Sequence, residues 1–161
     1  MKDLIVFYSL EGNTKYVVDK IKSRTGADIL SLVPKKAYPS KGFSKFIWGG
    51  KSAVMAEKPE LEEYEIDLNG YDRIIFGFPV WASNYTPPLR TFSTENAEGL
   101  KDKRFAAFAC QSGNGAEKAF AKLANSLGGI EFEHTAIFID PKDKAREETD
   151  KKIEAFCDVL L

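Results

Sequence analysis

The strongest constraint on the fold is the alternation of short apolar runs with segments of helical periodicity. Three runs, residues 3–8, 73–78 and 104–110, are apolar at nearly every position after the first. Such runs are typical of strands buried on both faces, as in a parallel sheet covered by helices. Two further segments, 27–33 and a stretch within 130–139, bring the candidate strands to five.

Segments of helical periodicity lie between these strands. They predict helices near residues 13–24, 87–96, 116–127 and 143–160. Pro87 suits a first helical turn after the capping candidate Thr86, and Gly128-Gly129 suits a left-handed helix end. The expected fold is therefore α/β: one domain over residues 1–161, with a doubly wound five-stranded parallel sheet in a three-layer α/β/α sandwich.

Residues 34–71 form a segment that is longer than a simple crossover between strands requires. Within it, Phe43, Phe46, Ile47 and Val54 recur at helical spacing and predict an extra helix near 41–56. The segment is rich in lysine up to residue 58, and acidic residues follow over 60–72. These charges suit two solvated faces, or a basic patch that faces an anionic partner or cosubstrate.

Composition narrows the protein class. The formal net charge of −1 disfavours a general nucleic-acid binder. No stretch approaches the roughly 18 apolar residues of a membrane span, and the first residues lack a signal-peptide pattern. Two cysteines, Cys110 and Cys157, are too few for a disulfide framework, so we expect a cytoplasmic protein in a reducing compartment.

The first strand ends abruptly in a polar turn. Residues 9–14, with the sequence SLEGNT, lead directly into the first predicted helix. The first amides of a helix have no intrahelical partner, and the helix dipole favours an anion there. Ser9, Asn13 and Thr14 add short donors, and Gly12 permits close backbone approach. The turn thus predicts a phosphate cradle made of neutral donors, because it contains no Lys or Arg.

This turn, in its place between first strand and first helix, resembles the phosphate-binding loop of the flavodoxin family, which commonly reads Ser/Thr-x-Thr-Gly-Asn-Thr. The resemblance extends along nearly the whole chain through the order of the elements. It implies the strand order 2-1-3-4-5 and FMN as the cofactor. The phosphate would lie at Ser9, Leu10, Glu11, Gly12, Asn13 and Thr14. Glu11 departs from the pattern, because it places a carboxylate where the family has a hydroxyl.

Two further strand ends carry suitable chemistry. Trp81 follows the third strand and is suited to stacking on a planar heterocycle. By the resemblance, the loop after this strand lies along the isoalloxazine, with residues Pro79, Val80, Trp81, Ala82, Ser83 and Asn84 and with Tyr85 as a second stacking candidate. The loop after the fourth strand would face the pyrimidine edge of the flavin, with residues Cys110, Gln111, Ser112, Gly113 and Gly115.

Other motifs indicate no separate chemistry. Gly50-Lys51-Ser52 resembles the end of a nucleotide P-loop, but position 45 holds Lys where that loop needs Gly. Cys110 lacks the Arg six residues later that a phosphatase loop requires. The sole histidine, His134, falls in the fifth strand region and suits a structural role. We therefore predict no catalytic side chain and no metal site.

Three functions remain open. The first is an electron-transfer flavoprotein with a redox partner protein or a small-molecule acceptor. The second is an FMN-dependent oxidoreductase that passes electrons from NAD(P)H to a quinone, with the lysine-rich segment and Phe43, Phe46 and Trp48 shaping the site. The third is a flavin-binding module without turnover. Residues 81–84 contain no glycine, and of these Asn84 best tolerates the positive φ that a typical carrier loop adopts on reduction.

Overall fold

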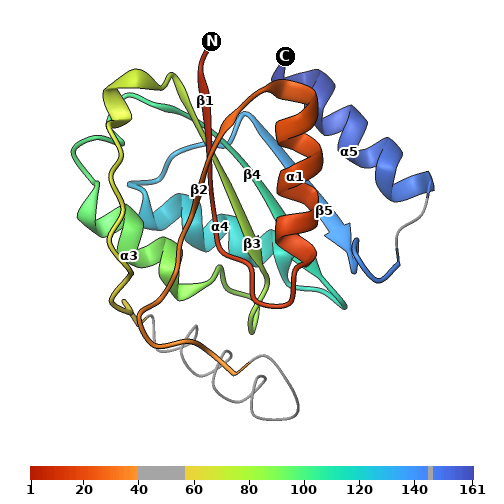
Figure 1. Cartoon of the computed structure of the whole chain (residues 1–161), viewed down its shortest axis with the longest axis horizontal. Coiled ribbons are helices and arrows are strands. Elements are labelled where there is room, and N and C mark those ends of the chain that lie inside the picture. Colours follow the sequence, from red (N-terminus) through yellow and green to blue (C-terminus); the bar gives the residue numbers. More distant parts are fainter. Residues whose placement is uncertain (40–56, 145–146) are drawn as a thin grey trace.

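The computed structural model of the chain describes residues 1–39, 57–144 and 147–161. The helix predicted near 41–56, with Phe43, Phe46 and Trp48, lies outside the described residues. Five parallel strands form one sheet in the order β2-β1-β3-β4-β5, which confirms the doubly wound topology (Figure 1). The strands are β1 (Asp3–Phe7), β2 (Asp28–Ser31), β3 (Arg73–Pro79), β4 (Arg104–Gln111) and β5 (His134–Ile139).

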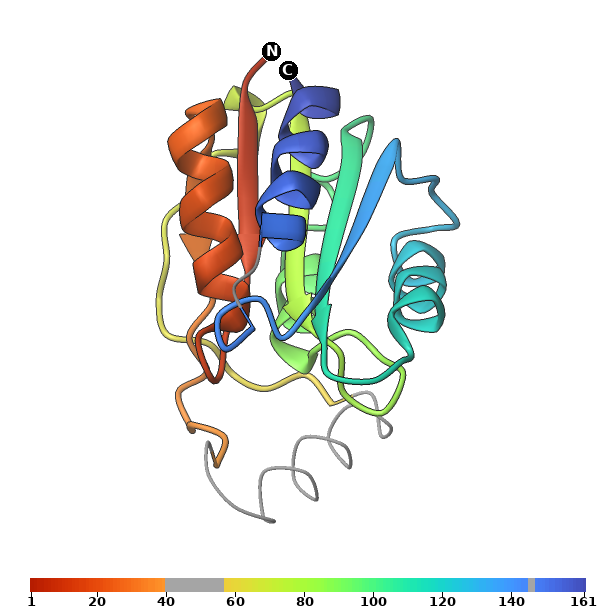
Figure 2. The same cartoon turned by 90° about the vertical axis from the view of Figure 1, so that its right-hand side faces the viewer.

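Helices cover both faces of the sheet, as predicted. On one face, α1 and α5 lie side by side, and α3 and α4 lie on the other (Figures 1 and 2). Their bounds are α1 (Asn13–Thr25), α3 (Pro87–Glu95), α4 (Ala116–Ser126) and α5 (Glu147–Leu160). Among the described residues, no helix combines the length and the apolar character that crossing a bilayer requires.

The alternation of side chains along the strands divides the core in two. In β1, Leu4 and Val6 pack in the cluster that includes α3 and α4, while Ile5 and Phe7 pack against α1 and α5. Successive residues of a strand point to opposite faces, so a wholly apolar strand supplies both cores at once. This explains why β1, β3 and β4 read as continuous apolar runs.

The two edge strands are less buried than the three central strands. In β2 and β5, only Phe138 is fully buried, because each strand pairs along one side and the helices lie over the centre of the sheet. A short 3₁₀ turn, η1 (Leu68–Gly70), precedes β3 and was not predicted. Thr86 stands at the N-cap of α3 as expected, but its side chain makes no capping hydrogen bond.

The described ends of the 34–71 segment run antiparallel beside each other. Pro34 and Leu61 form an isolated bridge, and the Lys35 ammonium lies 2.6 Å from the Glu60 carboxylate. This hydrogen bond raises the pKa of Lys35 above its usual value. At this point, the basic part of the segment is paired with its acidic part at the surface.

A buried ion pair joins three elements at the edge of the sheet where β1 and β3 begin. The guanidinium of Arg73, 1% exposed, donates to both carboxylate oxygens of Asp3 at 3.1 and 2.6 Å. It also donates to the carbonyl oxygen of Leu160 at the end of α5. Glu133 lies 3.6 Å from the same guanidinium. This edge is therefore held by paired charges that are shielded from water.

Replacing Arg73 tests how much this cluster stabilises the folded protein. Arg73→Met keeps most of the side-chain volume but leaves the Asp3 carboxylate without its partner in a largely buried place. We expect the free energy of unfolding to fall by about 3–5 kcal/mol in urea titrations. Arg104→Ala is the control, because Arg104 pairs with Glu133 at the surface, and its loss should cost about 1 kcal/mol or less. Equal losses for the two variants would contradict this account.

Candidate functional site

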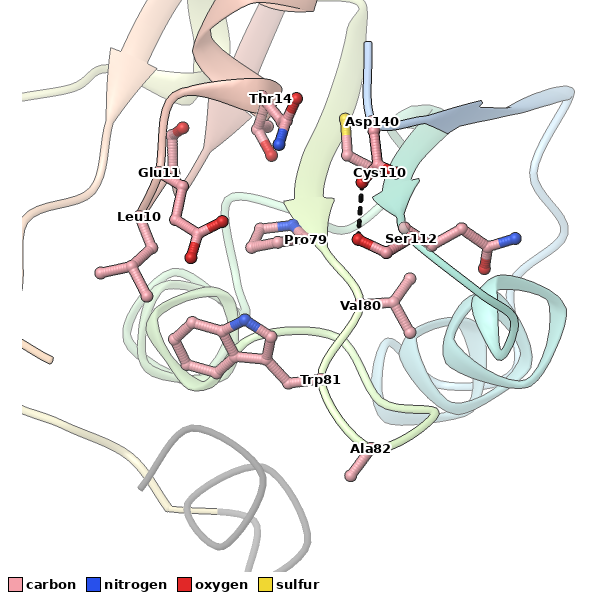
Figure 3. A pocket seen from close by; sticks show the side chains of 13 residues that line it. Leu10, Glu11, Thr14, Pro79, Val80, Trp81, Ala82, Cys110, Ser112 and Asp140 are labelled. Atoms are coloured by element: carbon pink, nitrogen blue, oxygen red, sulfur yellow. Dashed lines mark hydrogen bonds between the residues drawn. The ribbon is translucent and has the colours of Figure 1, made fainter. Parts of the chain in front are cut away.

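The loops after four strands enclose a cavity of about 250 Å³ at the carboxyl edge of the sheet (Figure 3). This is the edge where ligands bind in open parallel sheets, and the strand order reverses there between β1 and β3. The lining residues are Ser9, Leu10, Glu11, Asn13, Thr14, Pro79, Val80, Trp81, Ala82, Cys110, Gln111, Ser112 and Asp140. Three of these four loops are the ones that the sequence singles out.

The first loop brings the start of α1 to the cavity. Gly12 is the N-cap, with φ of 102°, a conformation that side chains with a Cβ rarely adopt. The Ser9 hydroxyl accepts a hydrogen bond from the Lys15 amide at 3.2 Å, so that donor is satisfied within the loop. The Thr14 side chain is buried in the cavity wall beside the Cys110 thiol, and its hydroxyl has no oxygen or nitrogen partner among the described residues. At a helix start, such a buried hydroxyl can donate a hydrogen bond to an anionic ligand.

A lysine distant in sequence lies on this loop. The Lys142 amide donates to Asn13 Oδ1 at 2.9 Å, and its ammonium donates to the carbonyl oxygen of Glu11 at 3.2 Å. Its stem passes over Gly12, where an added Cβ would come within 3.2–3.6 Å of it. The sequence predicts a cradle of neutral donors within residues 9–14, and the structure places a lysine from the segment after β5 beside it. Nothing in residues 9–14 signals this contact.

The second loop turns back on itself directly after β3. Trp81 and Asn84 exchange two backbone hydrogen bonds, at 3.0 and 2.9 Å, across the central residues Ala82 and Ser83. These two residues have φ of 49° and 58°, so the turn is of the type I′ kind that normally prefers Asn-Gly. The sequence favours Asn84 as the residue in this loop that best tolerates positive φ. In the structure, Ala82 and Ser83 have positive φ instead. Left-handed conformations at such residues store strain.

Aromatic rings fix the orientation of Trp81. Its indole packs edge-on against Tyr8 and Tyr38, with ring centroids 5.6 and 5.1 Å away. Burial raises the pKa of Tyr8, so its hydroxyl stays protonated at neutral pH. Sequence reasoning missed both tyrosines, although Tyr8 directly precedes the first loop. Tyr85 was predicted to stack on a ligand, but it is 2% exposed in the core beside Phe78 and does not line the cavity.

The third loop leaves β4 and opens α4. Gln111 Oε1 accepts a hydrogen bond from the Ala116 amide at 3.0 Å and so caps α4. Gly115, with φ of 104°, lies under Ser83, whose hydroxyl would be 2.8 Å from an added Cβ. Glycine at position 115 therefore permits the close approach of the second and third loops. Gly12, Ser83, Asn84, Gly113 and Gly115 thus shape the loops but do not line the cavity.

The fourth loop adds Asp140, which sequence reasoning missed. Its carboxylate accepts a 2.5 Å hydrogen bond from the Ser112 hydroxyl and pairs with the Lys144 ammonium at 2.9 Å. The hydrogen bond from Ser112, followed by that from Lys144, lowers the pKa of Asp140 below its usual value. The sequence signal for Asp140 is its position directly after the fifth strand. The carboxyl end of that strand lies at the same edge of the sheet as the other three loops.

Two other titratable groups have no nucleophilic or acid–base role at the cavity. Burial raises the pKa of the Cys110 thiol to about 12, so it is not a thiolate at neutral pH. His134 begins β5 and pairs with Ala106, at the end of the strand away from the cavity. Among the described residues, no group of three or more His, Cys, Asp or Glu side chains could hold a metal ion.

Comparison with known proteins identifies the family. A family model described as flavodoxin matches residues 2–155. The chain belongs to the flavodoxin family. Comparison with curated proteins finds no match.

Solved flavodoxin-like structures share the fold. A flavoprotein from Lactobacillus acidophilus in complex with FMN has a TM-score of 0.73 at 23% identity, over 89% of this chain and 97% of that one. A candidate flavoprotein from Bacteroides eggerthii has a TM-score of 0.77 at 20% identity, over 99% and 97%. The two-electron reduced flavodoxin of Megasphaera elsdenii has a TM-score of 0.56 at 20% identity, over 98% and 99%.

Substitution of Ala82 tests whether the turn in the second loop is strained. Ala82→Gly should raise the free energy of unfolding by about 0.5–1 kcal/mol, because glycine adopts the left-handed conformation without steric cost. The same change at Ala121, exposed on α4, should instead lower it by about 1 kcal/mol. Urea denaturation of both variants measures the opposite signs. A loss of stability in Ala82→Gly would show that the turn is not strained.

Proposed function

We propose that the cavity binds FMN and that the chain is an electron-transfer flavoprotein. The observation that carries this proposal is the start of α1, where the buried Thr14 hydroxyl lacks an oxygen or nitrogen partner among the described residues. The free amides of the helix start and this hydroxyl are suited to a phosphate oxygen. The FMN complex of the structurally similar Lactobacillus acidophilus protein supports the same assignment.

The remaining lining residues fit the other parts of the cofactor. The phosphate would be held by Ser9, Asn13, Thr14 and the backbone around Gly12. The Trp81 ring, partly exposed and fixed by two tyrosines, offers a flat apolar surface to a heterocycle. Gln111 and Ser112 bring amide and hydroxyl groups to the polar side of the cavity.

When bound, FMN supplies the chemistry, since it accepts and releases electrons. The chain holds the phosphate, orients the ring system through Trp81 and keeps a fixed negative charge at Asp140. Cys110 stays protonated and His134 lies at the opposite edge, so neither provides a competing reactive group. This set of residues suits a carrier, which needs binding and orientation rather than a catalytic side chain.

The partner of such a carrier would be a redox protein or a small-molecule electron acceptor. The alternative, an FMN-dependent oxidoreductase that uses NAD(P)H and a quinone, relies on a lysine-rich segment that lies largely outside the described residues. We place the protein in the cytoplasm, because both cysteines are free and buried and thus suit a reducing compartment.

Anaerobic titration of the purified holoprotein tests the role. A carrier should accumulate the one-electron-reduced flavin during stepwise reduction, as followed by visible absorbance. Direct passage to the fully reduced form, with rapid NAD(P)H oxidation in the presence of a quinone, would favour the oxidoreductase. Failure of the protein to acquire a flavin spectrum, as isolated or with added FMN, would contradict both roles and leave a binding module of this fold without redox turnover.

Replacing Trp81 tests the place of the ring system. Trp81→Ala should weaken FMN binding about tenfold or more and shift the reduction potential, because a stacking surface is lost. Fluorescence titration of the apoprotein and potentiometry provide the two readouts. Trp81→Phe is the matched control and should retain most of the affinity. Unchanged affinity and potential in Trp81→Ala would remove Trp81 from the site.

A further inference from the structure

We propose that Lys142 is the cation that binds the phosphate end of the ligand and makes the site prefer a phosphorylated flavin over riboflavin. This inference rests on the proposed function and adds a residue to it. Lys142 lies in the segment after β5, far in sequence from residues 9–14. Its ammonium is nevertheless 3.2 Å from the Glu11 carbonyl oxygen in the first loop.

The backbone around Lys142 is anchored on several sides. The preceding Asp140 is bound through its amide to the Gln111 carbonyl, at 3.1 Å, and through its carboxylate to Ser112. Pro141 is buried. The amide of Lys142 itself donates to Asn13 Oδ1 at 2.9 Å. The side chain therefore starts from a fixed point beside the N-terminus of α1.

Among the described residues around the cavity, Lys142 carries an ammonium that forms no salt bridge with a carboxylate. Among the described lining residues there is no Lys or Arg, while Glu11 and Asp140 are both carboxylic acids. The neighbouring ammonium groups of Lys15 and Lys144 pair with Asp19 and Asp140. Within the described part of the chain, the ammonium of Lys142 is bonded to a neutral carbonyl oxygen instead.

A phosphate dianion would be a stronger acceptor for this ammonium than a carbonyl oxygen. With a phosphate oxygen both partners are charged, so the attraction between opposite charges adds to the hydrogen bond. The flexible lysine stem, which lies against Gly12, permits the ammonium to reach a ligand at the helix start. Riboflavin has no phosphate, so the Lys142 ammonium would not strengthen its binding.

The backbone and side-chain contacts of Lys142 can be separated experimentally. Lys142→Met retains the amide that binds Asn13 and the apolar stem over Gly12, and removes only the charge. Lys142→Arg keeps the charge. Lys118→Met is the matched control, since Lys118 is exposed on α4 and its replacement changes the net charge equally.

Fluorescence titration of each apoprotein with FMN and with riboflavin gives the preference as a ratio of dissociation constants. We expect Lys142→Met to lower this preference about tenfold through weaker FMN binding, with riboflavin binding unchanged. Lys142→Arg and Lys118→Met should keep most of it. Added salt should reduce the preference of the wild type more than that of Lys142→Met. The same preference in Lys142→Met and Lys118→Met would overturn the inference.

A second measurement separates this inference from the proposed function. If the wild type binds neither flavin, the proposed function fails. Thermal unfolding of the apoprotein in inorganic phosphate then tests whether Lys142 binds phosphate. Stabilisation by phosphate over sodium chloride of equal ionic strength, lost in Lys142→Met and kept in Lys118→Met, supports the cation role. Equal stabilisation of both variants, or none in the wild type, overturns it.

Discussion

The structure depends on the burial of its three central strands on both faces. Because β1, β3 and β4 supply apolar side chains to two cores, their polar loops can lie only at the two edges of the sheet. All the strands run in the same direction, so every loop that follows a strand emerges at one edge. Four such loops meet there around the cavity. The site is thus a geometric result of how the core is packed.

The two edges of the sheet differ in how well their buried polar groups are satisfied. At the edge where the strands begin, the guanidinium of Arg73 on β3 has a carboxylate partner on β1 and a carbonyl partner on α5, and its charge is satisfied. At the carboxyl edge, a buried hydroxyl lacks an oxygen or nitrogen partner among the described residues, and three non-glycine residues, Ala82, Ser83 and Asp140, adopt positive φ. Stabilising interactions at one edge accompany strained and unsatisfied groups at the other, as is common at binding sites.

The sequence predicts the framework well because its signals are local. Continuous apolar runs identify β1, β3 and β4, and the small polar residues of 9–14 mark the loop before α1. Contacts between distant segments leave no such signal. The position of Lys142 over Gly12, the packing of Tyr8 and Tyr38 on Trp81 and the burial of Tyr85 all depend on tertiary packing. Positive φ at Ala82 and Ser83 likewise contradicts local preference, because the turn is closed by its flanking residues.

The contact between Ser83 and Gly115 links two loops that are separate in the sequence. A side chain at position 115 would collide with position 83, and a bulkier group at 83 would be tolerated only above glycine. An added Cβ would also lie 3.0 Å from the Cα of Ser83, and φ at position 115 is +104°, so a smaller residue at position 83 would not make room for a side chain at 115. Related chains that keep this contact should therefore retain glycine at position 115.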